Sequence, residues 1–126
     1  MSTKVLLEIA SQLVENCKNG KEAEGLATLY SDSAVSVEAV SMQKDGNREV
    51  VGLDAIRAKH AWCETTMQVN NSNIEGPFYH GNDRFGVIFE MDATNKETKE
   101  RLAFKELAIY TIGNGKIIRE EFYYTE

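Results

Sequence analysis

The sequence predicts an α+β fold in which three N-terminal helices pack on a strongly curved antiparallel sheet. Helical periodicity dominates the chain up to Met67, and four strand-like runs separated by short turns follow it. Helices followed by a meander of strands are typical of an α+β fold with an antiparallel sheet, whereas alternating βαβ units would indicate a parallel one.

The expected helices cover residues 4–18, residues 21–30 and a segment that starts at Gly52. In the first two, apolar residues recur every three or four positions, as in a helix with one buried face. Between the second and third helices, residues 34–40 are rich enough in valine to form a short strand. Residues 41–49 contain Lys44-Asp45-Gly46-Asn47, which is typical of a loop.

The four later strands are expected at residues 68–79, 84–94, 101–112 and 116–124. Pro77 lies in the first of them and indicates an edge or a bulge, because proline donates no backbone hydrogen bond. The last hairpin allows a two-residue Asn114-Gly115 turn, which pairs Gly113 with Lys116, or a three-residue loop, which pairs Ile112 with Lys116. We choose the three-residue loop, because it sorts the aromatic residues onto one face.

That choice defines an inner and an outer sheet face. The inner face collects Leu102, Phe104, Glu106, Ala108, Tyr110 and Ile112 with Ile118, Glu120, Phe122 and Tyr124, and the strand at 84–94 adds Phe85, Val87, Phe89 and Met91. The outer face exposes apolar Leu107, Ile109, Ile117 and Tyr123 among Lys105, Arg119 and Glu121. An apolar patch with a charged surround is a contact surface, so we expect a two-fold homodimer through it.

Length and composition predict a single domain over residues 1–126, since the chain has 126 residues. The net charge of −6 argues against a nucleic-acid partner. No apolar run reaches membrane-spanning length and no signal peptide is evident, so we expect a cytoplasmic protein without a membrane partner. Cys17 and Cys63 are expected to be free thiols, and no metal site is expected, because zinc needs three or four ligands at close spacing.

Four segments carry a resemblance to a known family: LATLYSDSAVSVEAV, GLDAIRAKHAW, EGPFYHGNDRFGVIFEMD and IYTIGNGKIIREEFYY. Together they resemble the nuclear transport factor two-like superfamily and, within it, the SnoaL-like proteins. The resemblance implies a cone-shaped barrel of cystatin-like topology that encloses one cavity. This fold hosts isomerases, cyclases, hydrolases, dehydratases and non-enzymatic binders, so it implies several activities at once.

Ketosteroid isomerase is the nearest catalytic comparison. Its general-base aspartate lies eight residues after the aromatic that closes the second helix, which corresponds to Glu38 after Tyr30. Its pocket tyrosine on the third helix corresponds to His60. Its two oxyanion donors correspond to Val14 and to a position near Ala108, neither of which can donate from its side chain. The acid of SnoaL-type cyclases corresponds to either Glu106 or Glu120.

Two functions follow as hypotheses, and both stay open. The first is a cofactor-independent isomerase-, cyclase- or hydratase-type enzyme that moves protons on a small apolar molecule, and the second is a non-catalytic binder or accessory protein. The expected catalytic residues are Glu38, His60, Glu106 and Glu120, and the expected ligand contacts are Tyr30, Phe89, Tyr110, Phe122 and Tyr124, with no metal and no cofactor.

The strand at 34–40 leaves the orientation of Glu38 undecided. Alternation favours Val35, Val37 and Ala39 inside with Glu38 in water, whereas the resemblance favours Glu38 inside. If the carboxyl groups converge in an apolar cavity, at least one should have a raised pKa, because burial and like charge both disfavour ionisation. The pKa of His60 beside a carboxylate would rise instead, and a hydrogen-bonded core histidine is an equal alternative for this residue.

Overall fold

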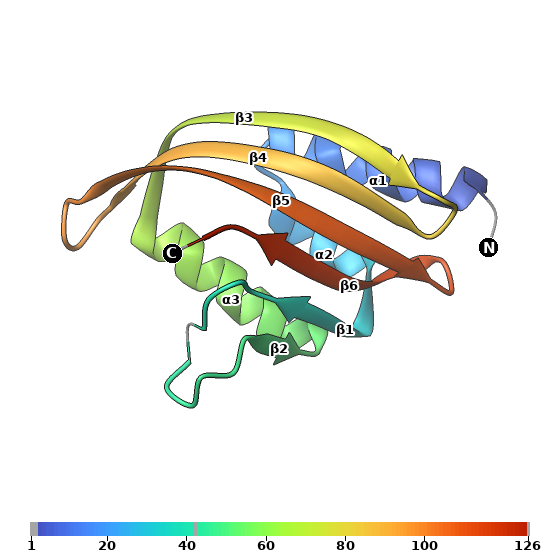
Figure 1. Ribbon diagram of the computed structural model, residues 1–126, viewed down its shortest axis with the longest axis horizontal. Coiled ribbons are helices and arrows are strands. Elements are labelled where there is room, and N and C mark those ends of the chain that lie inside the picture. The colour runs from blue at the N-terminus through green and yellow to red at the C-terminus, as the bar shows by residue number, and fades with distance from the viewer. Residues whose placement is uncertain (1–2, 42, 126) are drawn as a thin grey trace.

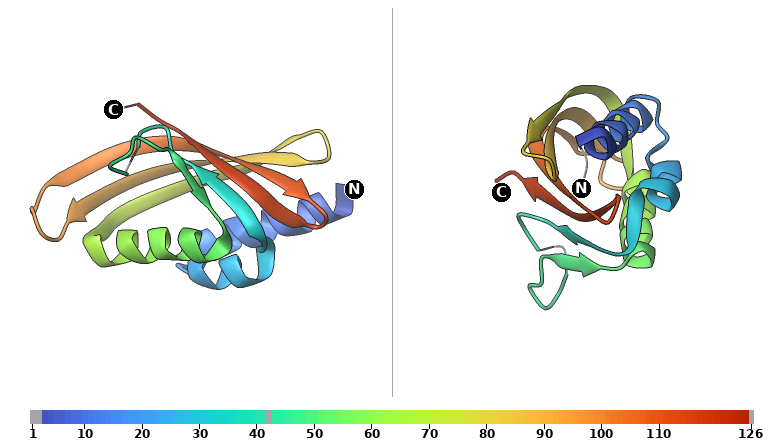
Figure 2. Two further views of the ribbon diagram at one scale, coloured as in Figure 1. Left: turned by 90° about the horizontal axis from the view of Figure 1, so that it is seen from below. Right: turned by 90° about the vertical axis from the view of Figure 1, so that its right-hand side faces the viewer.

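The computed structural model describes residues 3–41 and 43–125 and confirms the predicted α+β fold. Helices α1 (Thr3–Lys18), α2 (Glu22–Leu29) and α3 (Leu53–Thr66) pack on one face of a curved sheet that wraps around them without closing (Figures 1 and 2). The strands are β1 (Tyr30–Val37), β2 (Glu49–Val51), β3 (Met67–His80), β4 (Arg84–Asn95), β5 (Arg101–Gly113) and β6 (Lys116–Tyr123). None of the helices in this part of the chain is long and apolar enough to cross a bilayer.

The sheet is mixed, which corrects the prediction of a wholly antiparallel one. Its strand order is β2-β1-β6-β5-β4-β3, and β1 runs parallel to β6 while all other neighbours are antiparallel. The short strand β2 was missed, because its three residues follow a polar loop and have no periodicity of their own. The contact between β1 and β6 joins segments that are about 80 residues apart, so no local pattern indicates it.

The core lies between the helices and the concave face of the sheet. Leu6, Ala10 and Ile56 from the helices and Phe85 and Val87 from β4 are all 0% exposed. Fully burying an aliphatic or aromatic side chain of this size contributes about 1.5–3 kcal/mol. This packing fixes which side of each strand faces inward, and so it fixes which polar residues of the strands are buried as well.

Strand β3 confirms the interpretation of Pro77. The strand forms one edge of the sheet, and its register against β4 shifts between Glu75 and Phe78. Proline removes one backbone donor, so an edge strand with an irregular step accommodates it without a lost ladder bond.

The last hairpin corrects the choice of turn. Gly113 pairs with Lys116, and Asn114 and Gly115 have φ angles of 52° and 76°, as in a two-residue type I′ turn. A register shift follows at once, between the Thr111 and Ile112 pairs, and leaves Ile118 unpaired. The sorting of faces requires one extra residue in this hairpin. The sequence analysis placed that residue in the turn, whereas the structure places it in β6 as a bulge at Ile118.

Because of this bulge, Ile117 and Ile118 lie on the opposite sides of the sheet from those predicted. Ile117, expected outside, is 0% exposed, and Ile118, expected inside, is 39% exposed. Beyond the shift, Tyr110 lies opposite Glu120 and Ala108 opposite Phe122, so these residues share the inner face as expected. At the far end of β5, Leu102 and Phe104 belong to the same side but are 44% and 40% exposed, because the β4–β5 hairpin extends past α3 (Figure 2).

We predict that the left-handed turn limits substitution at Gly115. Gly115→Val should lower the free energy of unfolding by about 1–2 kcal/mol, because a β-branched side chain is strained at positive φ. Asn114→Gly is the matched control and should leave it nearly unchanged, since glycine adopts the same conformation freely. Urea unfolding followed by circular dichroism measures both, and equal midpoints for the two variants would contradict the turn assignment.

Candidate functional site

The site begins with a row of residues across the three central strands. Ser36 on β1 lies beside Glu120 on β6, which lies opposite Tyr110 on β5. Their exposed fractions are 0%, 1% and 3%, so all three face the interior. The alternation in the second half of β1 therefore points Ala34 and Ser36 inward. Glu38, which follows the end of this strand, continues the pattern with a side chain only 13% exposed.

Lys59 on α3 holds Glu38 in place. Its ammonium group forms an ion pair with Glu38 Oε1 and donates a hydrogen bond of 2.7 Å to Ser36 Oγ. The same nitrogen lies 4.8 Å from the centre of the Phe122 ring, within range of a cation–π contact. Sequence reasoning missed Lys59, although its spacing of three residues from Ile56 places it on the buried face of the helix.

Tyr124 completes the contacts of Glu38. Its hydroxyl donates a hydrogen bond of 2.8 Å to Glu38 Oε2. Burial raises the pKa of Tyr124 to about 12, and the hydrogen bond to Glu38 acts in the same direction. The carboxylate thus receives an ammonium on one oxygen and a phenol on the other, which fixes its orientation. Tyr124 was expected as a ligand contact, and the structure places it as a partner of the proposed base.

Glu106 and Glu120 both have raised pKa values, as expected for carboxyl groups that share an apolar interior. Burial raises the pKa of Glu106 to about 7, the charge of Glu38 adds to the rise and that of Lys59 opposes it. Burial also raises the pKa of Glu120 to about 7, and Lys59 and a hydrogen bond with Tyr30 oppose it. Among the residues that the structure describes, Glu120 Oε1 finds no hydrogen-bond partner. In both groups burial therefore favours the protonated form.

His60 behaves differently from the expectation. It is half-buried on α3, and its pKa is lowered, first by burial and then by the charge of Lys59. The predicted rise in pKa is wrong, because burial and, after it, the adjacent ammonium outweigh the opposing charges of Glu64 and Glu38. The imidazole is consequently neutral at physiological pH and could act as a hydrogen-bond donor or acceptor without carrying charge.

The five expected ligand contacts divide into two groups. Tyr30, Phe89 and Tyr110 are 7%, 7% and 3% exposed and belong to the core, where Tyr110 stacks on Phe85 with ring centres 4.9 Å apart. Phe122 and Tyr124 are partly exposed and line a hollow. This hollow encloses about 500 Å³ and is bordered by the ends of β1 and β6, through Val37, Glu38, Ala39, Arg48, Glu121, Phe122, Tyr123, Tyr124 and Thr125.

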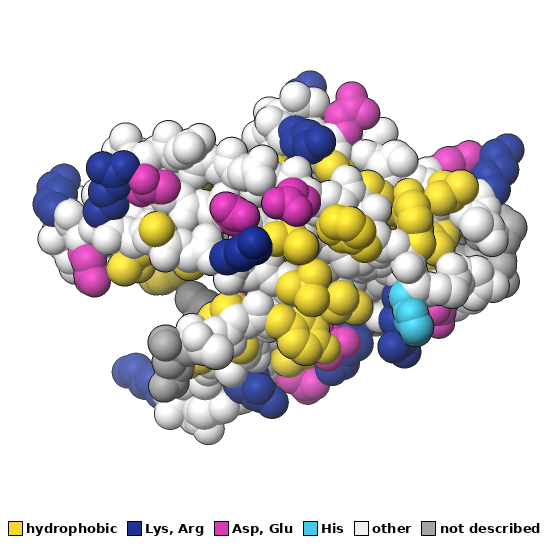
Figure 3. All heavy atoms as spheres, turned by 45° about the horizontal axis from the view of Figure 1, so that its top comes forward, with side chains coloured by type: hydrophobic (Ala, Val, Ile, Leu, Met, Phe, Trp, Pro, Cys, Tyr) yellow, Lys and Arg dark blue, Asp and Glu magenta, His cyan; other side chains and the backbone are white. Residues whose placement is uncertain are grey.

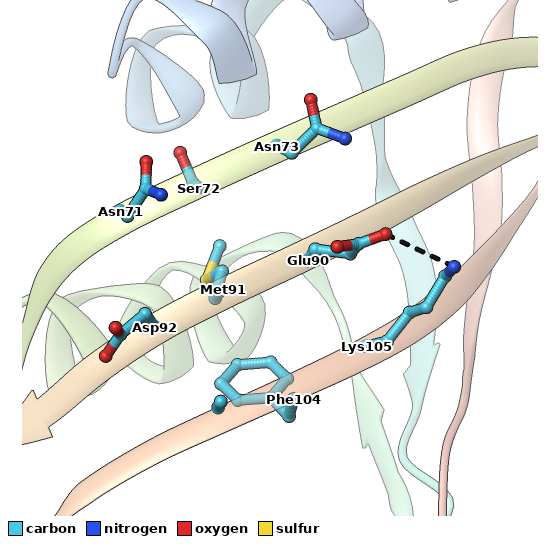
Figure 4. Close-up of a pocket in the computed structure, with 9 residues that line it drawn as sticks. Asn71, Ser72, Asn73, Glu90, Met91, Asp92, Phe104 and Lys105 are labelled. Atoms are coloured by element: carbon cyan, nitrogen blue, oxygen red, sulfur yellow. Dashed lines mark ion pairs between the residues drawn. The ribbon is translucent and has the colours of Figure 1, made fainter.

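A second hollow of about 400 Å³ lies along β3, β4 and β5 and is more polar (Figure 4). Its lining includes Asn71, Asn73 and an ion pair in which Lys105 Nζ is 3.2 Å from Glu90 Oε1. It contains none of the residues predicted for the site, and a solvated ladder of charged and amide side chains accounts for its polarity. Among the described residues, no group of three or more histidine, cysteine, aspartate and glutamate side chains could hold a metal ion.

Comparison with known proteins identifies the family. The profile of the SnoaL-like domain matches residues 2–124. A solved structure from Mesorhizobium loti, a candidate SnoaL-like polyketide cyclase also described as a carbohydrate phosphatase, is 34% identical, with a TM-score of 0.87 over 98% of this chain and 100% of its own. The chain belongs to the SnoaL-like family, within the nuclear transport factor two-like superfamily. The search of curated protein sequences found no match.

More distant structures share the fold. A Mycobacterium tuberculosis protein in complex with estradiol-17β-hemisuccinate is 20% identical, with a TM-score of 0.70 over 93% of this chain and 92% of its own. A Catenulispora acidiphila protein with a ketosteroid isomerase-like fold, in complex with trimethylamine, is 15% identical, with a TM-score of 0.64 over 82% of this chain and 75% of its own. Such proteins therefore bind small molecules of quite different chemistry on one fold.

We predict that Glu120 makes stability depend on pH. Between its ordinary pKa of 4.5 and its folded pKa of about 7, the folded protein keeps a proton that the unfolded chain releases. The free energy of unfolding therefore falls as pH rises through this range, by up to about 3 kcal/mol for this group. Glu120→Gln should remove that fall, because the amide does not ionise.

Urea unfolding at pH 4.5, 6 and 8 measures the effect as the difference between the wild-type and variant proteins. Glu8→Gln, at an exposed position of α1, is the control and should follow the wild-type curve. Parallel curves for Glu120→Gln and the wild type would show that Glu120 ionises normally.

Proposed function

We propose that this protein is a cofactor-independent proton-transfer enzyme that acts on a small, largely apolar carbonyl compound. The observation that carries the proposal is the placement of Glu38, a largely buried carboxylate held by Lys59 and Tyr124 at the wall of a hollow of about 500 Å³. A largely buried carboxylate with a fixed orientation is suited to act as a general base, because it is correctly placed before the substrate arrives.

The chemistry assigned to the site is an isomerisation of the keto–enol type. Glu38 takes a proton from the carbon next to the carbonyl group, and the electron pair moves onto the carbonyl oxygen to give an enolate. Glu106, whose pKa burial raises to about 7, returns a proton to a second carbon as the carbonyl re-forms. The proton held by Glu38 then passes to Glu106 through solvent, which restores the starting state. Each positioned group of this kind contributes typically 10²–10⁴-fold in rate. His60 and Glu120 are proposed to support the same network.

The alternative is a non-catalytic binder of a small molecule. Two observations favour it: both oxygens of Glu38 already have partners, and Tyr30, Glu120 and Tyr110 lie too deep to touch a ligand in the hollow. The complexes of the structural neighbours with estradiol-17β-hemisuccinate and trimethylamine support small-molecule binding under either proposal. Proton exchange on a bound ketone separates the two functions, because a binder leaves it unchanged.

We predict that the protein accelerates exchange of the α-protons of simple ring ketones in heavy water, followed by proton NMR. Glu38→Gln should slow this exchange by at least about 10²-fold, because the amide is not a base. Glu90→Gln, on the outer face, is the control and should exchange at the wild-type rate. If estradiol-17β-hemisuccinate binds but no ketone exchanges faster than in buffer, the protein is a binder and the catalytic proposal fails.

We also propose that the protein forms a homodimer through the outer face of the sheet. Residues that lie directly opposite one another on neighbouring strands share a face of the sheet. The apolar residues of the outer face are Val35, Val51, Phe78, Ile88, Leu107, Ile109 and Tyr123. Phe78 and Tyr123 are 53% and 51% exposed. Figure 3 shows hydrophobic side chains gathered over the middle of this face with charged groups around them. Such a patch supports a contact between copies.

We predict that Ile109→Lys gives a monomer at micromolar concentration, whereas the wild type is a dimer, because a charge at the centre of the patch would be buried without a partner. Leu7→Lys is the matched control, since Leu7 is 42% exposed on α1, on the helical side of the molecule. Static light scattering measures the mass of each. A wild-type monomer would remove the proposal.

A further inference from the structure

The hollow beside Glu38 is bordered by three charged residues, Glu38, Arg48 and Glu121. Each carboxylate has a cation of its own. Glu38 forms an ion pair with Lys59, and Glu121 Oε1 lies 3.3 Å from Arg119 Nε. Among the residues that the structure describes, no carboxylate lies within ion-pair distance of the Arg48 guanidinium group. The uncompensated charge that the hollow presents to a ligand is therefore positive.

Strand pairing places Arg48 next to Glu38. The backbone N–H of Glu38 donates a hydrogen bond of 2.9 Å to the carbonyl oxygen of Arg48. This bond continues the antiparallel register in which Val37 lies opposite Glu49, so Glu38 and Arg48 lie opposite each other. Opposed residues on neighbouring strands project their side chains to the same face. One ligand in the hollow can therefore contact both side chains.

The loop before β2 holds Arg48 in this position. Gln43 Nε2 donates hydrogen bonds of 3.1 Å and 3.0 Å to the carbonyl oxygens of Asn47 and Glu49, which flank Arg48 in sequence. Arg48 Nη1 donates a hydrogen bond of 3.4 Å to the carbonyl oxygen of Ala39, another residue that borders the hollow. A guanidinium group carries five N–H donors, so most of them are left for a ligand at this exposed side chain.

The other donors around the hollow do not offer a charge to a ligand. Tyr124 donates its hydroxyl proton to Glu38. Tyr123 lies opposite Leu107 and so belongs to the outer face, and the hydroxyl group of Thr125 is neutral. Lys59 does not border the hollow. Recognition of an anionic group would therefore fall to Arg48.

We propose that Arg48 binds a carboxylate group of the ligand, so that the substrate of the proposed reaction is a keto acid with an apolar body. The inference rests on the proposed function, because it names the substrate class of the same site. A planar guanidinium group fits a carboxylate with two parallel hydrogen bonds. The apolar body of the ligand would then lie against the Phe122 ring, and its ketone would lie beside Glu38.

The charges of the site favour a carboxylate over a phosphate monoester. One arginine balances one negative charge, and the hollow already contains the carboxylates of Glu38 and Glu121. The second charge of a phosphate monoester would be repelled by both without a cation of its own, since like charges at short distance destabilise each other. With a carboxylate, Lys59 balances Glu38, Arg119 balances Glu121 and Arg48 balances the ligand.

A ring ketone with and without a charge tests the inference. The two probes are a cyclohexanone that carries a propanoate side chain and the methyl ester of the same compound, and calorimetric titration measures their binding. The acid should bind wild-type protein about tenfold more tightly than the ester, because a hydrogen bond to a charged group is worth at least about this much. Arg48→Met should make the two affinities equal, and Arg48→Lys should keep part of the difference.

Arg84→Met is the matched control, because Arg84 is an exposed arginine at the start of β4 that does not border the hollow. It should keep the full preference for the acid. Equal binding of acid and ester to wild-type protein, no binding of the acid at millimolar concentration, or a loss of preference that Arg84→Met shares would each overturn the inference.

Salt provides a measurement that needs no variant. An exposed ion pair is screened as ionic strength rises, so the preference of wild-type protein for the acid should shrink in high salt while the affinity for the ester changes little. A preference that salt leaves unchanged would contradict binding by Arg48. Circular dichroism and thermal unfolding establish that Arg48→Met is folded, and if it is not, the salt dependence and Arg48→Lys decide the question.

Exchange of the α-protons of the same two ketones separates this inference from the proposed function. If the acid binds through Arg48 but neither ketone exchanges faster than in buffer, the inference holds for a non-catalytic site and the enzymatic proposal fails. If both ketones exchange with equal kcat/KM and the exchange depends on Glu38, the base is established and the role of Arg48 is refuted. A lower KM for the acid that rises to that of the ester in Arg48→Met supports both.

Discussion

The charge of Lys59 sets the balance of the interior, because three carboxyl groups act on the same small volume around it. Glu38 forms an ion pair with Lys59. Burial raises the pKa values of Glu106 and Glu120 to about 7, and the positive charge of Lys59 opposes that rise in both groups. Two carboxylates without a cation of their own in a low-dielectric interior are costly, and a bound proton is the least costly compensation. The same arrangement supplies one paired carboxylate and two carboxyl groups whose pKa values burial raises.

This arrangement depends on a strand pairing between distant parts of the chain. The parallel contact of β1 with β6 brings Ser36 beside Glu120, and the hydrogen bond from Tyr124 to Glu38 joins residues 86 positions apart. The antiparallel contact of β6 with β5 then adds Tyr110. Glu106 lies four residues before Tyr110 on β5 and belongs to the same face of the sheet. The helices supply the fourth side, with Lys59 on the face of α3 that already buries Ile56. The site is thus a product of tertiary structure, because β1, α3, β5 and β6 contribute to it from distant parts of the chain.

That origin explains what the sequence could and could not predict. Periodicity and composition located the three helices and five of the six strands within a few residues, and the sorting of faces placed Glu106 and Glu120 inside. The inward orientation of Glu38 remained undecided, because three apolar neighbours at alternate positions favoured the opposite face. Lys59 was missed because a lysine on an amphipathic helix is normally solvated. The turn was misassigned because a bulge and a three-residue loop shift the register alike, and only the backbone angles distinguish them.

The partners of Glu38 do not by themselves decide between an enzyme and a binder. An ionised carboxylate has about four lone-pair sites on its two oxygens, so an ammonium and a phenol leave acceptor capacity for a proton from a substrate. The ammonium and the phenol hold the carboxylate in one orientation beside the hollow. A general base gains from such positioning, because its lone pair is aimed at the substrate before the proton moves. A site that binds only a neutral ligand gains nothing from a buried charge pair beside it, because both ions lose hydration when they are buried.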